Sequence, residues 1–371
     1  MKIAVVISTF LPKIGGMGQM AYLEAARLSS PDYQIKVFTM DYGNYLSESD
    51  FKINYLKPLL KIGDGGILPQ LFFGLRDFDL IHLHFPFYGS GFLVYLAAVF
   101  WKIPLLVTYH MDASPKGVIK KTVKYFSDYF FSNLIFKTAK RVILVDAGKK
   151  QFKFLKNIVP QKLITLNNVI DTKIFFPQNI KLSDLNLEEI DGKRILLFVG
   201  NLLPLKRLDL ILQALSILRR DDLVLLVVGD GYERKNYEDL SRQLKLDKQV
   251  YFVGQISDQR QLAKYYSVAD FTVIPSDYES FSLVAIESMA CATPVIASRL
   301  AALEDKIQLG NTGLLFNSGD GGDLAKKIIE ALNYSKEELG KLKMNCKKHI
   351  LVNNDLDEHL SKLLEIYRHT I

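Results

Sequence analysis

Short apolar runs alternate with stretches of helical periodicity along this chain, and they do so in two separate series. The first series includes KIAVVIS, IKVFTM, LIHLH, PLLVTYH, RVILVD and ITLNNV, and the second includes RILLFVG, LVLLVVG, VYFVG, FTVIPS and PVIAS. Helical periodicity fills several of the intervals, for example 17–30, 89–101 and 117–138. Near-continuous Val/Ile/Leu strands separated by helices are typical of parallel sheets covered on both faces. The sequence therefore predicts an α/β fold with two doubly wound domains.

The length of the chain and one polar segment define the expected domain boundary. At 371 residues the chain is long enough to bury two cores. Segment 177–193 (PQNIKLSDLNLEEIDGK) is polar and nonperiodic, so we place the link between the domains there. We expect one domain over 1–175 and a second over 176–354, with a helical run at 355–371.

Cysteine usage and the apolar segments indicate a cytoplasmic protein. Two cysteines, Cys291 and Cys346, are too few for a disulfide framework or a metal quartet, which favours a reducing compartment. The opening MKIAVVISTF fits a first strand better than a signal peptide, because its apolar run is short. Segment 91–101 (GFLVYLAAVFW) falls short of the ~20 apolar residues that span a bilayer.

Positive charge is concentrated in the first half of the chain. Residues 1–170 carry 21 lysines and arginines against 11 acidic residues, a net +10, whereas residues 171–371 carry a net −3. An anionic partner of the first half is one explanation, and a membrane surface, a phosphorylated acceptor and nucleic acid are the candidates. A general richness in lysine is the other. No nucleic-acid-binding motif is present, so we expect no nucleic-acid partner.

Segment 116–141 (KGVIKKTVKYFSDYFFSNLIFKTAKR) combines lysines with aromatic residues. A basic, aromatic helix is typical of an element that lies on an anionic membrane. The same residues fit a helix that packs on the sheet and exposes a lysine edge. The apolar positions recur at core spacing, which favours packing.

A pair of glutamates in PSDYESFSLVAIESMACATPVIAS (275–298) carries the strongest chemical signal. Glu279 and Glu287 lie between two strand-like runs, one in a loop and the other on the following helix. At the carboxyl end of a parallel strand, both carboxylates can face a bound ligand. The helix that starts near Ser282 adds unpaired backbone N–H groups that suit a phosphate. Hydroxyl acceptors beside a phosphate site indicate a nucleotide-sugar.

A second loop, in VGNLLPLKRLDLILQAL (199–215), places cations after a strand. Lys206 and Arg207 follow the strand that ends at Gly200, and Asn201 lies in the same loop. A lysine there can neutralise a diphosphate leaving group. Solvated charges at a helix start are the alternative interpretation.

Two later loops contain glycine after a strand. Gly229 and Gly231 stand in VVGDGYER, and Gly254 and Ile256 stand in VYFVGQIS, where backbone groups can line a pocket for a base. Glycines also simply permit tight turns, so each loop is a weak signal.

The first half contributes a glycine loop and a histidine. Gly15 and Gly16 follow the first strand in LPKIGGMGQM, where backbone amides can approach a ligand closely. His110 is the last residue of the strand-like run PLLVTYH, and Asp112 follows it in TYHMDAS. A lone histidine is more often structural, but its place at a strand's carboxyl end favours function.

Taken together, the motifs resemble those of the retaining glycosyltransferases of family 4. The resemblance rests on the Gly-Gly loop, T-x-H-x-D (108–112), NNVID (167–171), VG-x(5)-K (199–206) and PS-x(2)-E-x(7)-E-S-M-A-x(3)-P-V (275–295), extended by GLLF and SGD. It implies the GT-B architecture: two facing Rossmann-like domains with a deep cleft, an N-terminal domain for the acceptor and a C-terminal domain for the nucleotide-sugar. It also implies that the helix at 355–371 returns to the N-terminal domain.

The resemblance assigns roles to individual residues. It implies that Glu287 binds the ribose hydroxyls, Glu279 the donor sugar and Lys206 the diphosphate, with His110 beside the reacting centre. The remaining donor-binding candidates are Gly16, Asn201, Arg207, Gly231, Ile256, Phe281, Ser282 and Leu283. It implies no metal and no cofactor beyond a UDP-sugar or GDP-sugar donor.

The implied activity is the retaining transfer of a hexose to an acceptor hydroxyl in glycan or glycolipid synthesis, by a cytoplasmic or membrane-associated enzyme. Asn201 stands where the family has arginine, and Ala301-Ala302 replaces its glycine pair. These departures leave a noncatalytic nucleotide-sugar-binding protein as the alternative. Ser282 replaces the second glycine of the family's E-G-F-G motif, a smaller change because the backbone amide at this position remains.

Overall fold

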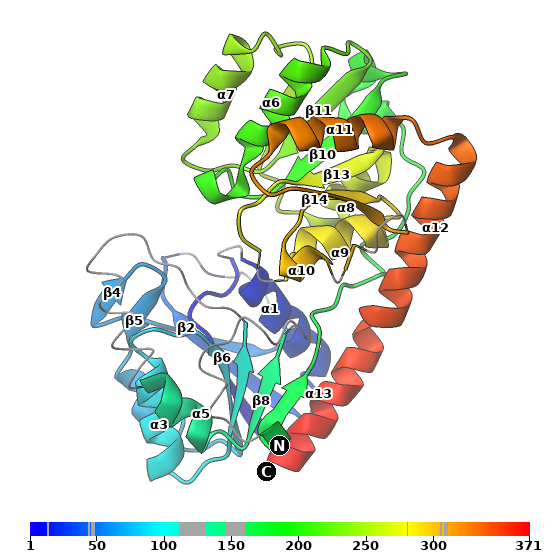
Figure 1. The fold of residues 1–371 in the computed structure, drawn as a ribbon. Helices are drawn as coiled ribbons and strands as arrows, with labels where there is room; N and C mark the ends of the chain where they lie inside the picture. Colours follow the sequence, from blue (N-terminus) through cyan, green and yellow to red (C-terminus); the bar gives the residue numbers. More distant parts are fainter. Residues whose placement is uncertain are drawn as a thin grey trace. The chain divides into compact units, whose positions relative to one another are not determined.

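A computed structural model of the chain describes residues 1–12, 15–43, 45, 49–110, 131–145, 160–279, 281–304, 306–307 and 311–371. The chain forms two compact units (Figure 1). Unit 1 comprises Met1–Asn168 together with Asp357–Ile371, and unit 2 comprises Val169–Leu356. Asp112 and segment 116–130 of the lysine-rich stretch lie outside the described residues.

Unit 1 is built on a parallel sheet of seven strands in the order β3-β2-β1-β6-β7-β8-β9. The strands are β1 (Lys2–Val6), β2 (Gln34–Met40), β3 (Lys52–Leu56), β6 (Leu80–Phe85), β7 (Leu105–Tyr109), β8 (Arg141–Leu144) and β9 (Leu163–Thr165). β4 (Leu60–Ile62) and β5 (Gly65–Ile67) form a separate antiparallel pair. The chain leaves β1 toward β2 and later returns to β6 on its other side, so the strand order reverses between β1 and β6.

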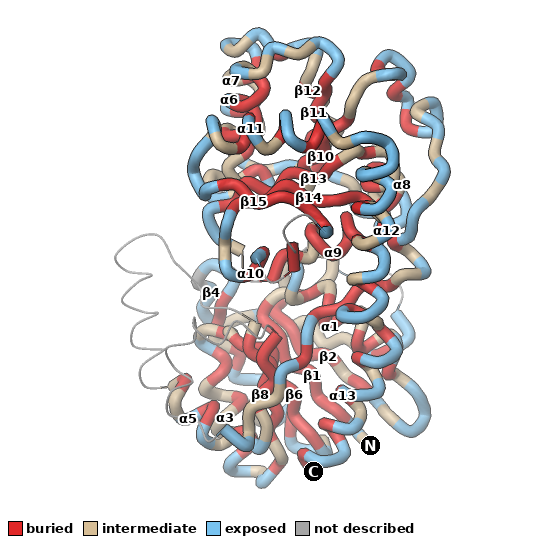
Figure 2. Tube along the Cα trace, turned by 45° about the vertical axis from the view of Figure 1, so that its right-hand side comes forward, coloured by how far each residue is buried: buried red, intermediate tan, exposed pale blue. Residues whose placement is uncertain are grey.

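Both faces of this sheet are covered by helices, as the apolar runs predicted. One face packs against α2 (Gln70–Gly74), α3 (Gly91–Phe100) and α5 (Asn133–Thr138). The other packs against α1 (Gly16–Leu28) and the C-terminal helix α13 (Leu356–Thr370), which contributes Leu363, Ile366 and Tyr367 to the core. The inner strands β1, β2, β6, β7 and β8 therefore bury most of their residues and appear as buried segments in Figure 2, whereas the edge strands β3 and β9 are only partly buried.

Unit 2 contains a parallel sheet of six strands in the order β12-β11-β10-β13-β14-β15. The strands are β10 (Arg194–Val199), β11 (Leu223–Val228), β12 (Val250–Gly254), β13 (Phe271–Ile274), β14 (Val295–Ser298) and β15 (Gly313–Phe316). The order reverses between β10 and β13, because the chain moves outward from β10 to β12 before it returns. Open sheets of this kind bind ligands beyond the carboxyl ends of the two strands at such a switch point.

Helices also cover both faces of the second sheet (Figure 1). One face packs against α6 (Leu208–Leu218), α7 (Arg234–Gln243) and α11 (Gly321–Leu332), and the other against α8 (Gln259–Val268) and α9 (Leu283–Ala290). α10 (Ala301–Glu304) is short, and α12 (Lys336–Asn353) contacts α9. Local sequence defines several helix starts: Asp258 and Asp320 cap α8 and α11, and Ser335 forms a capping box with Glu338 at α12.

The predicted α/β class and both doubly wound parallel sheets are confirmed. The last strand of the first series is shorter than the run ITLNNV predicted, since β9 ends at Thr165. The polar segment 177–193 contains two 3-10 helices, at Leu182–Leu185 and Glu188–Ile190, and Leu185 and Ile190 are buried.

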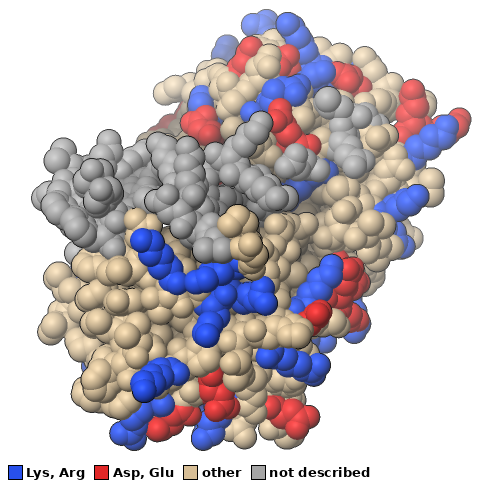
Figure 3. All heavy atoms as spheres, turned by 60° about the horizontal axis from the view of Figure 1, so that its bottom comes forward, with Lys and Arg blue, Asp and Glu red and all other residues tan. Residues whose placement is uncertain are grey.

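Both basic and acidic side chains occur on the described surface. Figure 3 shows basic and acidic side chains interspersed on one face, with a group of neighbouring Lys and Arg side chains near its centre. None of the helices that the structure describes is both long enough and apolar enough to cross a membrane.

Candidate active site

Lys206 and Glu279 meet at the switch point of the unit 2 sheet. Lys206 ends a 3-10 helix (Pro204–Lys206) that follows β10, and Glu279 lies in the loop after β13. The Lys206 Nζ donates to Glu279 Oε1 at 2.6 Å, and the Ser276 hydroxyl donates to the same oxygen at 2.8 Å. The side chains are 25% and 10% exposed, so both can still reach a ligand. A cation and a carboxylate thus lie side by side where a doubly wound sheet binds its ligand.

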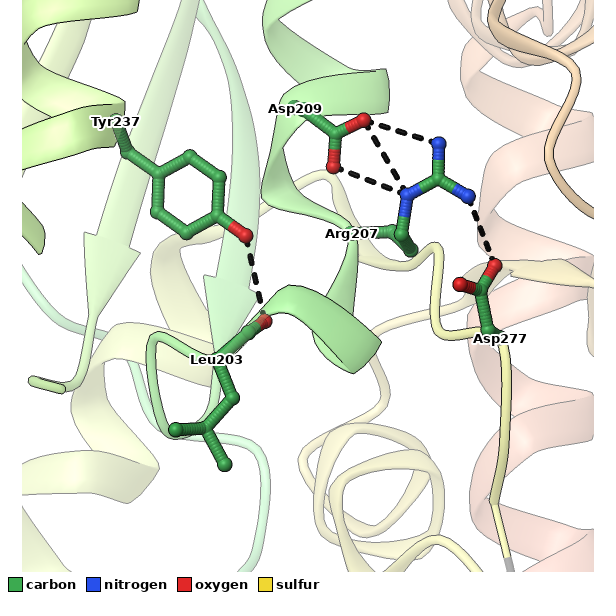
Figure 4. A network of polar contacts seen from close by, with 5 residues as sticks. All are labelled: Leu203, Arg207, Asp209, Tyr237 and Asp277. Carbon is green, nitrogen blue, oxygen red and sulfur yellow. Dashed lines mark hydrogen bonds and ion pairs between the residues drawn. The ribbon is translucent and has the colours of Figure 1, made fainter. Parts of the chain in front are cut away.

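Arg207, the second predicted cation, is held by two carboxylates (Figure 4). Its guanidinium donates to both oxygens of Asp209 and, through Nη1, to Asp277 Oδ1 at 2.9 Å. Both partners raise the pKa of Arg207 above its ordinary value, the Asp209 hydrogen bond most of all. The backbone of Arg207 is left-handed, with φ 52°. These contacts tie the loop after β10 to the loop after β13, and donor binding by Arg207 stays a prediction.

The start of α9, which follows Glu279 by a few residues, presents backbone N–H groups. Leu283 is the first helical residue, and Ser282 before it has a left-handed backbone with φ 64°. Phe281 is buried and lies under the Lys306 ammonium, which is 3.9 Å from the ring centroid. The Ser282 hydroxyl is buried without a hydrogen-bond partner among the described residues. First-turn amides and the positive dipole end suit a phosphate group.

Glu287 lies one turn further along α9 and is buried. The Tyr266 hydroxyl on α8 donates to its Oε2 at 2.7 Å. Burial raises the pKa of Glu287 from 4.5 to about 7, and the hydrogen bond from Tyr266 opposes this shift. The carboxyl therefore titrates near neutral pH and not near 4.5. Ribose binding by Glu287 stays a prediction.

The raised pKa of Glu287 makes the stability of unit 2 depend on pH. Between pH 4.5 and 7 the unfolded chain ionises this carboxyl while the folded chain keeps it protonated, so stability falls as pH rises. The shift corresponds to about 3 kcal/mol, which is present below pH 4.5 and lost above pH 7. Glu287→Gln keeps an acceptor for Tyr266 but cannot ionise. We expect the free energy of unfolding, measured with urea, to fall between pH 5 and pH 8 in the wild type but much less in Glu287→Gln. The same pH dependence in both proteins would contradict the assignment.

The glycines after β11 are required by close backbone approach. A Cβ on Gly229 would lie 1.9 Å from the Gly200 carbonyl oxygen, and a Cβ on Gly231 would lie 2.4 Å from that of Leu202. The Gly-x-Gly therefore lets the loop after β11 pack on the loop after β10. Asn201, between the two contacted residues, is exposed.

The remaining donor-binding candidates of unit 2 lie in loops. Ile256 is half-buried in the loop after β12. Ala301 begins α10, and the Ala302 carbonyl accepts a hydrogen bond from Lys306 Nζ at 2.9 Å. The pair that replaces the family's glycines is thus part of a short helix in this chain.

In unit 1, His110 follows β7 directly and is partly exposed. Its ring is nearly parallel to that of His84, at an interplanar angle of 18° with centroids 5.1 Å apart, and its Nε2 lies 2.9 Å from His84 Nδ1. Burial lowers the pKa of His110 to about 3, so the imidazole is neutral at physiological pH. Gly16 is the exposed first residue of α1, which follows β1.

Sequence reasoning missed three polar residues behind His110. His84 lies on β6, Glu24 on α1 and His359 on α13, and all three are buried. The signal was present in LIHLHF, where two histidines at alternate positions of an apolar strand share one face of the sheet. Their partners come from distant helices, which local spacing does not reveal.

One group of described residues has the composition of a metal site. Ligand atoms of Glu24, His82 and His84 lie within 4.8 Å of one another. The two ring nitrogens of His82, however, already lie 2.9 Å from the Tyr367 hydroxyl and 2.7 Å from the Thr108 hydroxyl. We interpret the group as a hydrogen-bonded network.

Comparison with known families accounts for both halves of the chain. Residues 14–173 match the model of Glycosyltransferase Family 4, and residues 183–349 match that of Glycosyl transferases group 1. The chain belongs to the family 4 glycosyltransferases. The resemblance drawn from the motifs is confirmed, and Lys206, Glu279 and Glu287 all lie in the second matched region.

Relatives and solved structures agree with this assignment. The chain is 32% identical over 275 residues to D-inositol 3-phosphate glycosyltransferase 2 of Catenulispora acidiphila, a match that covers 69% of this chain and 63% of that relative. The match thus spans less than two-thirds of the relative's length. Sucrose-phosphate synthase of Thermosynechococcus elongatus is 25% identical with a TM-score of 0.80, covering 99% and 98% of the two chains. Anabaena HepE in complex with UDP is 18% identical with a TM-score of 0.83, covering 100% of both, and shares the GT-B fold.

Proposed function

We propose that this glycosyltransferase moves a hexose from a nucleotide-sugar to an acceptor hydroxyl with retention of anomeric configuration. The observation that carries the proposal is the contact between Lys206 and Glu279 at the switch point of the unit 2 sheet. A diphosphate needs a cation, and a sugar needs an acceptor for its hydroxyl groups. The start of α9 supplies further N–H donors at the same edge.

Each part of the donor has a proposed partner in unit 2. Lys206 and the amides of Phe281, Ser282 and Leu283 hold the diphosphate. Glu279 binds the sugar hydroxyls, and its hydrogen bond from Ser276 orients the carboxylate. The ribose hydroxyls bind Glu287, and the loops at Gly231 and Ile256 line the base, while Asn201 contributes hydrogen bonds at most. The UDP in HepE supports a UDP-sugar as the first donor to test, with a GDP-sugar as the second.

Retention follows from transfer on one face of the sugar. Neither Glu279 nor Glu287 is assigned as a nucleophile, because Glu279 is proposed to bind the sugar hydroxyls and Glu287 the ribose hydroxyls. The leaving phosphate then helps to deprotonate the incoming hydroxyl on the same side. Lys206 and the α9 dipole stabilise the negative charge that develops, without a divalent metal.

Unit 1 is the proposed site of the acceptor. His110, at the end of a strand, is proposed to lie beside the reacting centre, and Gly16 stays a candidate for binding the donor. The acceptor class we propose is a glycan or a lipid-linked sugar. A basic half of the chain suits a phosphorylated or membrane-bound acceptor.

Thermal unfolding in the presence of UDP-, GDP- and ADP-sugars tests the donor assignment. A donor at about 100 times its Kd adds ~2.7 kcal/mol of stability, which corresponds to a Tm rise of several degrees for a domain of this size. We expect one nucleotide class to give this rise, and Glu287→Ala to lose it. Equal shifts in the two proteins would contradict ribose binding by Glu287.

Turnover separates an enzyme from a binding protein. We expect slow hydrolysis of the stabilising donor, undiminished by EDTA, with the anomeric configuration retained in the released or transferred sugar as read by proton NMR. Stabilisation without any hydrolysis or transfer would favour a noncatalytic role, and inversion would overturn the proposed mechanism.

A further inference from the structure

A buried chain of polar side chains runs through unit 1 behind His110. His110 Nε2 lies 2.9 Å from His84 Nδ1, and His84 Nε2 lies 4.0 Å from Glu24 Oε2. Glu24 Oε1 lies 3.0 Å from His359 Nε2, and His359 Nδ1 lies 2.9 Å from the Asn167 carbonyl oxygen. The chain therefore connects the end of β7 with β6, α1 and the C-terminal helix α13, all within one unit.

Proton positions at the far end follow from the hydrogen-bonding partners. A carbonyl oxygen only accepts, so His359 Nδ1 must carry a hydrogen toward Asn167. One further proton lies between His359 Nε2 and Glu24 Oε1. Whether this proton is bound to His359 Nε2 or to Glu24 Oε1, the other oxygen of Glu24, Oε2, carries no hydrogen and is an acceptor. Glu24 is thus held by α13, and its acceptor oxygen Oε2 lies 4.0 Å from His84 Nε2.

The proton on His84 follows in turn. Its Nε2 is buried without a hydrogen-bond partner among the described residues, and the acceptor Glu24 Oε2 lies 4.0 Å from it. An N–H faces that oxygen favourably, whereas a lone pair would face it with repulsion. His84 Nε2 therefore carries the hydrogen and His84 Nδ1 is bare. The His110–His84 contact at 2.9 Å then requires His110 Nε2 to donate.

Neutral rings are the condition for this reasoning, and burial supplies it. Burial lowers the pKa of His110 to about 3 and that of His84 well below its ordinary value, and neighbouring histidines add to the effect at His84. Each ring carries one hydrogen at physiological pH. With its Nε2–H committed to His84, His110 has a bare Nδ1.

We propose that His84 is a positioning residue that fixes His110 in the Nε2–H tautomer, so that His110 Nδ1 accepts a hydrogen bond from a hydroxyl of the bound sugar or acceptor. The inference rests on the proposed function for the part played by His110 as a catalytic residue. The tautomer itself is a property of the free protein. Glu24 and His359 act one step behind, by holding the proton of His84 on Nε2.

Two substitutions of His84 separate positioning from packing. His84→Asn keeps an acceptor for His110, because the amide oxygen of asparagine lies close to the place of the imidazole Nδ1. His84→Leu fills a similar volume without an acceptor. A buried N–H without an acceptor is costly. In the leucine variant we therefore expect the ratio of the Nδ1–H to the Nε2–H tautomer of His110 to rise by about tenfold. Tyr367→Phe is the matched control, because Tyr367 contacts His82 from α13 outside this chain of contacts.

The experiment is a long-range proton–nitrogen correlation spectrum of the free protein labelled with ¹⁵N-histidine. Six histidines allow assignment by single replacements. We expect the Nε2–H tautomer of His110 in the wild type, in His84→Asn and in Tyr367→Phe, and its loss in His84→Leu. An Nδ1–H tautomer in the wild type, or identical spectra for His110 in the two His84 variants, would overturn the proposal.

Steady-state kinetics with the stabilising donor adds the functional readout. We expect kcat to be about tenfold lower in His84→Leu than in His84→Asn, with the donor KM within about twofold, because the loss is of the correct tautomer. Equal kcat values in the two variants would contradict the role in turnover. A wild type that shows the expected tautomer but neither transfers nor hydrolyses any donor would refute the proposed function and leave the tautomer assignment standing.

Discussion

Replacing Lys206 with alanine is expected to lower kcat by about 10²–10³ while the fold stays intact. The loss is large because the ammonium is the charged donor proposed for the diphosphate as it leaves, and one well-placed donor of this kind contributes ~2.7–4 kcal/mol to transition-state stability. The effect on Tm is small, since Lys206 is partly exposed and Glu279 keeps its hydrogen bond from Ser276. Initial rates of sugar transfer, or of donor hydrolysis, measure the effect.

Lys327→Ala is the matched control for this experiment. Lys327 also forms an ion pair in unit 2, with Glu330 Oε2 at 2.7 Å, and its side chain is 30% exposed against 25% for Lys206. It lies on α11, away from the switch point, so its removal should leave kcat unchanged. Glu279→Ala should lose transfer as Lys206→Ala does. Near wild-type turnover in either site variant would overturn the assignment of that residue.

Gly229→Ala is expected to destabilise unit 2 by about 3 kcal/mol or more, at or above the upper end of the usual range for a single substitution. The new Cβ would lie 1.9 Å from the Gly200 carbonyl oxygen, and the backbone of Gly229 has φ +139°, which side chains rarely adopt. Relief would require the ends of β10 and β11 to separate, although Gly200 N–H donates to the Val228 carbonyl at 3.0 Å. Urea unfolding followed by circular dichroism measures the change.

Two other glycines separate the causes of that loss. Gly192 has φ +78° with nothing within 4 Å of an added Cβ, so Gly192→Ala should lose only the ~1–2 kcal/mol of a left-handed backbone. Gly340 lies within α12 and also has open space around it, so Gly340→Ala should gain about 0.5–1 kcal/mol. A Gly229→Ala variant no less stable than Gly192→Ala would show that the overlap with Gly200 is relieved cheaply.

The sheets were predictable because burial on both faces leaves a direct mark on sequence. Runs such as LVLLVVG and RILLFVG became β11 and β10, and each was followed by the loop that the sequence placed after it. Motif order also predicted the family. The end of β9 was missed, since ITLNNV is apolar only in part and the strand stops at Thr165.

The candidate site was predictable as a set of residues but not as a set of contacts. Lys206 and Glu279 were each expected near the diphosphate and sugar, and the structure brings them to 2.6 Å across 73 residues of sequence. Arg207 was expected to face the ligand, yet Asp209 and Asp277 occupy its guanidinium. The pKa of Glu287 could not be read from a motif, because it depends on burial beside Tyr266.

By itself, the sequence determined the two parallel sheets, the family and the identity of the polar residues at the strand ends. These depend on local apolar runs and on short spacings, which any stretch of chain carries within itself. Tertiary structure alone decided which polar groups meet. Glu24 and His359 are 335 positions apart, and they touch because α1 and α13 cover the same face of one sheet. Pairing of that kind is set by the packing of helices on strands, and so the proton positions around His110 follow from the fold and from no motif.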